Sequence, residues 1–245
     1  GLHPGDEILG INGMGVAGLG AQRAVSLLRG PVGTSVDLAV AHPAPRPSKQ
    51  TVHVTRGRFP LAPISTWLLD SKTAYVRVPY LGRGAVEATS KALVEYRESG
   101  VRSVILDLRE NPGGALEEAV AFADLFLPQK TPVVMLSTRG SKRSLAQTQS
   151  APVFVGRLVT LVDEATGGSA EVLAASLKAQ QRSAIVGRAT AGRTSAESVF
   201  ALSTGAALRI TTGFYIDPPG TSWAGSGVLP SIPVRAEPAS FGEAR

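Results

Sequence analysis

The residues best suited to do chemistry lie between Leu161 and Leu173, where the sequence reads L-V-D-E-A-T-G-G-S-A-E-V-L. Apolar residues at 157–162 predict a buried strand, and apolar residues at helical spacing predict a helix that follows the turn and continues to about Gln180. A turn into a helix N-terminus gathers backbone N–H groups that can stabilise an anion or an oxyanion. The small hydroxyl residue Ser169 lies in this turn, which is therefore the first place to look for a nucleophile.

A second stretch, D-L-R-E-N-P-G-G at residues 107–114, follows a continuous apolar strand predicted at 104–108. Strands of this kind are typically buried on both faces of a parallel sheet. Because the carboxyl ends of parallel strands meet at one edge, the two stretches should converge there. We interpret the backbone N–H groups of Gly113 and Gly114 as an oxyanion hole, with that of Ser169 as a third donor. The alternative is a plain turn that needs glycine dihedral angles.

The composition excludes several kinds of site. There is no cysteine, so the chain has no thiolate nucleophile, disulfide or Cys-ligated metal. The histidines are His3, His42 and His53, and none lies in the long C-terminal region. A Ser-His-Asp triad or a histidine-based zinc site is therefore not expected there, and we predict neither metal nor cofactor. A hydroxyl nucleophile in that region would need lysine as its base.

The charged residues do not indicate nucleic-acid binding. The formal net charge is +6, but the basic residues are scattered and aromatic residues make up only 5% of the chain. The densest basic cluster, at 139–143, is interpreted as an exposed loop. No apolar run approaches the roughly 18 residues that a membrane-spanning helix needs. Residue 1 opens inside sequence that already reads as folded, so we expect the natural N-terminus to lie upstream.

Residues 1–57 predict a small α+β unit. The succession G-L-H-P-G-D-E-I-L-G-I-N-G, a helix at 21–29 and R-G-P-V-G-T-S-V resembles the later part of a PDZ domain. PDZ domains bind peptide C-termini between a strand and a helix, with a glycine-rich loop that holds the carboxylate. That strand and loop would precede residue 1, so the resemblance implies a partial domain whose N-terminal half is missing. It leaves only the helical wall as a peptide-binding surface: Ala21, Ala24, Val25 and Leu28.

The elements that must position the two glycine-containing stretches alternate between strand and helix. Strands are predicted at 74–79, 104–108, 133–136 and 184–186, and helices at 85–99 and from 115 to about 127. This order predicts an α/β domain with a largely parallel sheet. We place a linker at 59–67, the large domain at 58–234 and a tail at 235–245.

Five ordered motifs give this domain a family resemblance: D-L-R-x-N-P-G-G, L-V-D-E-x-x-x-x-x-x-E, G-x-x-T-x-G, L-R-I-T-T and G-x-L-P-x-I-x-V. With the partial PDZ domain they resemble the carboxyl-terminal processing peptidases, or tail-specific proteases, over nearly the whole chain. The resemblance implies an α/β core related to the crotonase-like and ClpP-like folds. It also implies a PDZ domain that recognises protein or peptide C-terminal tails, a serine nucleophile and a lysine base.

Transferring the family motifs residue by residue gives an unexpected set of side chains. The resemblance places the nucleophile three residues before Glu171, at Gly168. It places the base directly after G-R-A-T-A-G, at Arg193. A supporting glutamine falls on Glu197. Glycine has no side chain to attack a carbonyl, and arginine, with a pKa above about 12, is no general base near neutral pH. We expect Glu197 to pair with Arg193 and replace the catalytic pair by a salt bridge.

Ser169 is the remaining candidate nucleophile. It lies one residue beyond Gly168, which in a helix start turns its side chain by about 100°. Its alternative role is a helix N-cap or a small residue in a tight turn. Lys178 lies about half a helical turn out of phase with it. Thr194 and Ser195, which flank Arg193, are interpreted as ordinary loop hydroxyls.

Two functions therefore stay open. One is a serine endopeptidase that trims C-terminal tails and uses Ser169; the other is an inactive homologue that binds such tails as a scaffold or regulator. The substitutions predict weak or absent proteolysis. The family resemblance implies a periplasmic or secreted location, and leaves open whether the chain forms an oligomer or has a regulatory partner.

Overall fold

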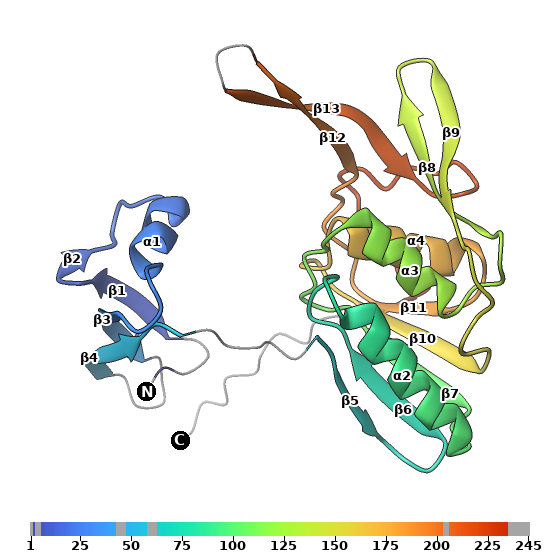
Figure 1. The fold of residues 1–245 in the computed structure, drawn as a ribbon, viewed down its shortest axis with the longest axis horizontal. Coiled ribbons are helices and arrows are strands. Elements are labelled where there is room, and N and C mark those ends of the chain that lie inside the picture. The colour runs from blue at the N-terminus through green and yellow to red at the C-terminus, as the bar shows by residue number, and fades with distance from the viewer. Residues whose placement is uncertain (1, 3–5, 43–47, 58–62, 203–205, 235–245) are drawn as a thin grey trace, which may run out of the picture. The chain divides into compact units, whose positions relative to one another are not determined.

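The computed structural model describes residues 2, 6–42, 48–57, 63–202 and 206–234. The chain divides into two compact units, Gly1–Leu61 and Ala62–Arg245, which are described separately below (Figure 1). His3 and the predicted tail at 235–245 lie outside the described residues, and so do residues 58–62, where we placed the start of the linker. In the described part of the chain no helix is long and apolar enough to cross a membrane.

The first unit is a four-stranded antiparallel sheet of order β2-β1-β3-β4 with one helix. Asn12 and Gly13 form the predicted turn with positive φ angles of 49° and 76°, as a two-residue hairpin requires. A small core of Ile11, Val36, Leu38 and Val40 lies between sheet and helix. The elements are β1 (Glu7–Ile11), β2 (Met14–Gly15), α1 (Ala21–Leu28), β3 (Ser35–His42) and β4 (Ser48–Thr55).

The second unit is built on a six-stranded sheet of order β14-β11-β10-β7-β6-β5. All its neighbouring strands are parallel except β5, which pairs antiparallel with β6, so the predicted α/β class with a largely parallel sheet is confirmed. The predicted linker is wrong at its C-terminal end, because residues 65–67 belong to β5. The strands are β5 (Ser65–Leu68), β6 (Thr73–Arg77), β7 (Ser103–Asp107), β10 (Arg157–Val162), β11 (Ala184–Gly187) and β14 (Ile232–Pro233).

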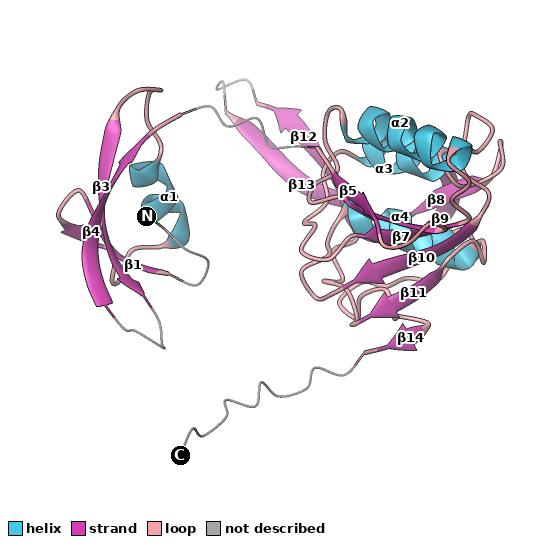
Figure 2. Ribbon diagram, turned by 90° about the horizontal axis from the view of Figure 1, so that it is seen from below, coloured by secondary structure: helices cyan, strands magenta, loops and turns pink. Residues whose placement is uncertain are grey.

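Three helices, α2 (Ala85–Glu98), α3 (Leu116–Asp124) and α4 (Ser169–Ala179), cover one face of this sheet (Figures 1 and 2). Burial consequently alternates along the strands: in β7, Val104 and Leu106 are buried while Ile105 is only partly buried. The expectation that this strand is buried on both faces is therefore wrong. Helix α4 lies at the centre of the core and is buried from Ser169 to Leu177.

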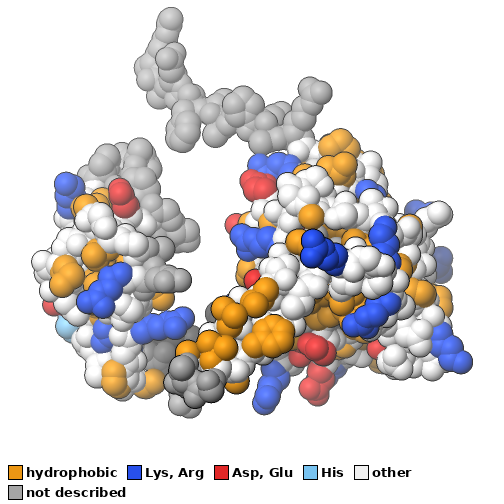
Figure 3. All heavy atoms as spheres, turned by 90° about the horizontal axis from the view of Figure 1, so that it is seen from above, with side chains coloured by type: hydrophobic (Ala, Val, Ile, Leu, Met, Phe, Trp, Pro, Cys, Tyr) orange, Lys and Arg blue, Asp and Glu red, His pale blue; other side chains and the backbone are white. Residues whose placement is uncertain are grey.

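A second, antiparallel sheet of order β12-β13-β8-β9 extends from this core. Its strands are β8 (Pro132–Thr138), β9 (Ser141–Gln147), β12 (Ser195–Ala201) and β13 (Ala207–Ile216). The basic cluster predicted as a loop is instead a tight turn at Arg139 and Gly140 followed by the exposed start of β9. The β12–β13 hairpin begins at Ser195, two residues after Arg193, and carries exposed apolar side chains (Figure 3): Val199, Phe200, Leu202, Leu208, Ile210 and Phe214.

Candidate active site

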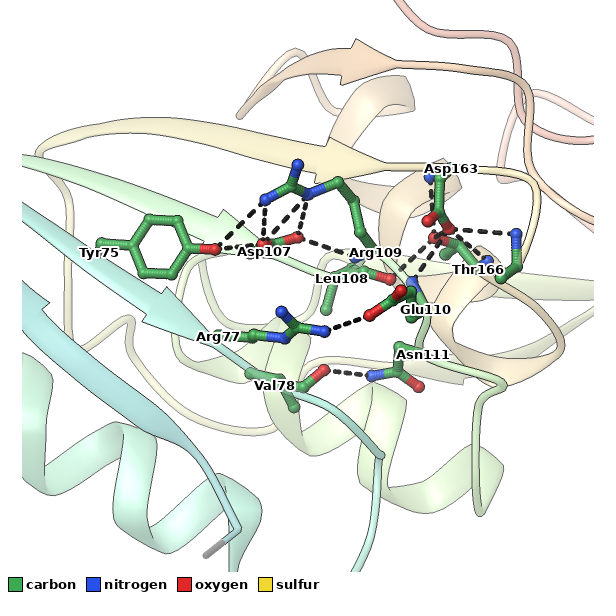
Figure 4. Close-up of polar contacts among 11 residues, drawn as sticks. Tyr75, Arg77, Val78, Asp107, Leu108, Arg109, Glu110, Asn111, Asp163 and Thr166 are labelled. Carbon is green, nitrogen blue, oxygen red and sulfur yellow. Dashed lines mark hydrogen bonds and ion pairs between the residues drawn. The ribbon is translucent and has the colours of Figure 1, made fainter. Parts of the chain in front are cut away.

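The turn between β10 and α4 is joined to the 107–114 loop by hydrogen bonds, so the two predicted stretches do converge (Figure 4). The Oδ1 atom of Asp163 accepts hydrogen bonds from the backbone N–H groups of Glu110 at 3.0 Å and Thr166 at 2.9 Å. Thr166 Oγ1 donates to the Leu108 carbonyl at 2.8 Å. Sequence reasoning did not assign a role to Asp163 or Thr166. An Asp and a Thr three residues apart before a helix are, however, a recognisable turn signal.

Gly168 is the N-cap of α4 and has a backbone conformation that disfavours side chains, with φ 57° and ψ −125°. A nucleophilic serine on a strand-to-helix turn occupies a comparably strained conformation in α/β-hydrolases. Space is not the obstacle, because a Cβ built on Gly168 would have only the Pro112 carbonyl oxygen as a close neighbour, at 3.4 Å. The turn therefore has room for a side chain at the position that the family resemblance assigns to the nucleophile, and that assignment stays a prediction.

Ser169 does not take over that role in this conformation. Its side chain is 6% exposed, and its Oγ atom is buried without a hydrogen-bond partner in the described part of the chain. Lys178 lies at the other end of α4, where its Nζ atom donates to the Leu229 carbonyl at 2.7 Å. The N-cap interpretation of Ser169 is also wrong, because Gly168 is the N-cap and Ser169 is the first helical residue.

Glu171 supplies the cap instead. The Glu171 side chain is fully buried, and its Oε2 atom accepts the backbone N–H groups of Gly168 at 3.0 Å and Arg193 at 2.8 Å. Its Oε1 atom accepts the Gly192 N–H at 2.7 Å and the Thr190 hydroxyl at 2.5 Å. The sequence suggested Glu171 only as an alignment anchor. In the structure this one carboxylate fixes the backbone at both Gly168 and Arg193, the two positions predicted for nucleophile and base.

Arg193 lies beside the turn, with its Nη1 atom 3.4 Å from the position of a Cβ on Gly167. Its side chain makes no hydrogen bond or ion pair with any other described residue, so the predicted pairing with Glu197 is wrong. Glu197 lies on β12 after a bulge at Ala196 and forms its ion pair with Arg209 of β13. The register between β12 and β13, which the sequence does not reveal, determines that Glu197 pairs with Arg209.

The two glycines of the predicted oxyanion hole differ. The Gly113 N–H donates to Asn111 Oδ1 at 2.8 Å, while Asn111 Nδ2 donates to the Val78 carbonyl at 2.8 Å. Gly113 is therefore not available as an oxyanion donor in this conformation. Gly114 is exposed, its N–H makes no hydrogen bond to another described residue, and its oxyanion role stays a prediction. A Cβ on Gly114 would come within 1.7 Å of the Leu81 carbonyl oxygen, so packing alone requires glycine there.

Asp107, Arg109 and Tyr75 form the polar network at the end of β7 (Figure 4). Arg109 Nη2 donates to Asp107 Oδ2 at 2.7 Å and forms an ion pair with it, and the Tyr75 hydroxyl also donates to that carboxylate. Burial would raise the pKa of Asp107, but the hydrogen bonds from Arg109 and Tyr75 outweigh it and hold the pKa below its usual range. Burial and the Asp107 hydrogen bond raise the pKa of Tyr75, which keeps its proton.

The low pKa of Asp107 predicts a pH-dependent stability. A carboxyl group whose pKa is lower in the folded state stabilises the fold above its unfolded pKa of about 3.9, and this contribution is lost as the pH falls through the folded value. We therefore expect stability to decrease below about pH 4, with a shallower dependence in Asp107→Asn. Urea unfolding between pH 3 and pH 6 measures this, and equal slopes for the two proteins would contradict it.

The helical wall of the first unit is only partly available to a peptide. Ala24 and Leu28 pack against the small core of that unit, whereas Val25 is 43% exposed. The side chain of Ala21 lies outside the described residues. Peptide binding by α1 stays a prediction. No group of three His, Cys, Asp or Glu residues that could hold a metal ion is present among the residues described.

Two family models match this chain. The model of peptidase family S41 matches residues 72–234, and the PDZ-domain model matches residues 1–41. Among curated relatives, a carboxyl-terminal-processing protease of Synechocystis sp. is 33% identical over 99% of this chain and 57% of its own length. The chloroplastic carboxyl-terminal-processing peptidase 2 of Arabidopsis thaliana is 30% identical over 98% of this chain and 47% of its own length.

The solved structures agree with the fold. The structure of a photosystem II D1 C-terminal processing protease is similar with a TM-score of 0.73 and 24% identity, over 96% of this chain and 64% of that one. A putative S41 protease from Bacteroides fragilis follows at a TM-score of 0.63 and 18% identity, over 96% and 67%. At these identities the structures establish the fold alone. This chain spans about half the length of the curated relatives it matches.

Proposed function

Because this chain belongs to peptidase family S41, we propose that it binds the C-terminal tails of proteins without cleaving them by serine–lysine chemistry. The observation that carries the proposal is the turn at Gly168. The family resemblance assigns the nucleophile to this turn and the base to position 193, where the chain has Gly168 and Arg193. The names of the relatives refer to carboxyl-terminal processing, which supports C-terminal tails as the class of partner.

The packing around this turn holds the proposed site in one shape. Glu171 accepts hydrogen bonds from Gly168 and Arg193, and Thr166 ties the turn to the 107–114 loop. Binding is the function that needs the shape and not the nucleophile.

The rival function is a peptidase that uses Ser169. A serine nucleophile needs a base within hydrogen-bond reach and an oxygen that the substrate can approach. Ser169 Oγ is buried and has no partner among the described residues. This arrangement favours the non-catalytic function.

Incubation with unfolded casein tests the proposal. We expect no cleavage above a blank that contains no protein, and we expect saturable binding of fluorescein-labelled peptides with free C-termini, measured by anisotropy. Ser169→Ala, purified in parallel, controls for contaminating proteases in the casein assay, where it should also show no cleavage above the blank. Robust cleavage that Ser169→Ala abolishes would establish the peptidase instead.

The location is proposed only from the family. A periplasmic or secreted location would place the chain where the C-terminal tails of exported proteins are exposed. Fractionation of cells that produce the full-length protein would test this location. An oligomer or a regulatory partner likewise remains a question for solution measurements.

A further inference from the structure

We propose that the emptied site receives the terminal carboxylate of the bound tail, with Arg193 as its cationic anchor. The inference rests on the proposed function, because it states which part of the tail this site takes. It is carried by three features of this region: a guanidinium group close to Gly167, a positive charge without an anionic partner among the described residues, and a buried hydroxyl without a partner in the adjoining turn.

The first feature is the position of the guanidinium group. Arg193 Nη1 and the Pro112 carbonyl oxygen lie 3.4 and 3.5 Å from the position of a Cβ on Gly167. The same Pro112 oxygen lies 3.4 Å from the Cβ position of Gly168. The guanidinium group, the 112–114 loop and the vacated nucleophile position are therefore neighbours, and a small planar group held by Arg193 would lie beside Gly168.

The second feature is the charge of this region. The N-terminus of α4 carries a partial positive charge, and Arg193 adds a full one beside it. Glu171 is the anion of the turn, but its two oxygens already accept four hydrogen bonds from three backbone N–H groups and one hydroxyl. The guanidinium group itself has no anionic partner among the described residues. Arginine presents its N–H groups in a fork that matches a carboxylate, which a lysine does not.

The third feature is the orphaned hydroxyl of Ser169. A buried hydroxyl without a partner is unfavourable, so it is a candidate partner for a ligand that reaches the turn. Ser169 is 6% exposed, and its Oγ atom lies 3.2 Å from the Cβ position of Gly113, where the two glycine-containing turns pack closely against each other. A carboxylate held by Arg193 beside Gly168 would therefore lie next to the residue that carries this hydroxyl.

The edge of β12 favours a peptide over a small free acid. This strand is at the edge of its sheet, and it begins at Ser195, two residues after Arg193. A peptide whose C-terminus lies at Arg193 would run antiparallel to β12 and pair with its free edge. Val199 and Phe200, 67% and 49% exposed, would contact apolar residues of that peptide (Figure 3).

Two forms of one peptide test the inference in the full chain. The probe is a fluorescein-labelled decapeptide with apolar residues before its C-terminus, prepared with a free carboxylate and as the C-terminal amide. We expect amidation to weaken binding about 10- to 100-fold, the value of one bidentate, charge-assisted contact. Arg193→Gln should bind both forms equally and weakly. Arg139→Gln, which removes an exposed arginine in the β8–β9 turn, should keep the full preference.

The outcomes separate the inference from the proposed function. If the free and amidated peptides bind the unmodified chain equally well, the carboxylate inference is wrong while tail binding stands. A preference that persists in Arg193→Gln would place the carboxylate elsewhere, for example in the PDZ unit, and would also overturn it. If acetate displaces the peptide when the two are at equal concentration, the site binds small anions in general and the inference of a peptide-tail site is wrong. If neither peptide binds, the proposed function itself fails.

Gly168→Ser is a second variant that does not remove charge. Its added hydroxymethyl group would occupy the vacated position beside Pro112, so the carboxylate preference should fall about 10-fold or more even though Arg193 is intact. Circular dichroism checks that the variant is folded. An unchanged preference in this folded variant would mean that the carboxylate does not lie beside Gly168.

Discussion

Glu171→Ala should lower the free energy of unfolding of the second unit by about 4 kcal/mol or more. The side chain is fully buried, and its removal leaves three backbone N–H groups and the Thr190 hydroxyl without their acceptor. Each buried donor without an acceptor costs about 1–3 kcal/mol. Glu171→Gln should have a smaller effect, because the amide keeps one acceptor oxygen.

Urea unfolding followed by tryptophan fluorescence measures this loss in the right unit. The chain has two tryptophans, Trp67 and Trp223, and both belong to the second unit. Glu197→Ala is the matched control, since it removes a glutamate whose partner, Arg209, is 73% exposed, and such pairs contribute about 0–1 kcal/mol. If Glu171→Ala costs no more than this control, the hydrogen bonds of Glu171 do not hold the site together.

Gly168→Ser combined with Arg193→Lys should restore cleavage of unfolded casein. The backbone N–H groups of both positions are held by the same oxygen of Glu171, so a serine and a lysine placed there start from a fixed separation. A lysine can lose its proton on burial and act as base, which arginine cannot do. A positioned base contributes about 10²- to 10⁴-fold to such reactions. The double variant should therefore exceed Gly168→Ser alone by about 100-fold or more.

Strain and oxyanion geometry limit how much activity returns. A serine at φ 57° costs about 1–3 kcal/mol, which the fold must tolerate. The Gly113 N–H would also have to leave Asn111 to stabilise an oxyanion. Gly168→Ala with Arg193→Lys carries the same strain without a nucleophile and is the control. Equal rates for the two double variants, both folded, would mean that the scaffold no longer supports catalysis.

Local patterns in the sequence predicted the class of fold. Apolar runs and glycine-containing turns fix where strands and helices begin and end, and the helix after Gly168 ends at Ala179, close to the predicted Gln180. The one-sided burial of β7 was not predictable, because it depends on which face of the sheet the helices cover. Nor was β5, whose Trp67 stacks on Tyr75 of the neighbouring strand.

At the site, the sequence by itself determined the chemistry that is missing. If the family resemblance places nucleophile and base at 168 and 193, the glycine and arginine there exclude a serine–lysine pair at these two positions whatever the fold does, because side-chain identity is covalent. Only the tertiary structure decided which distant partners the remaining groups have: Glu197 with Arg209, Asn111 with the Val78 carbonyl, and Glu171 with the donors of residues 190–193. The reason is physical. Hydrogen bonds and ion pairs are fixed by distances and strand register between segments that are far apart in the chain, and one sequence read alone contains neither.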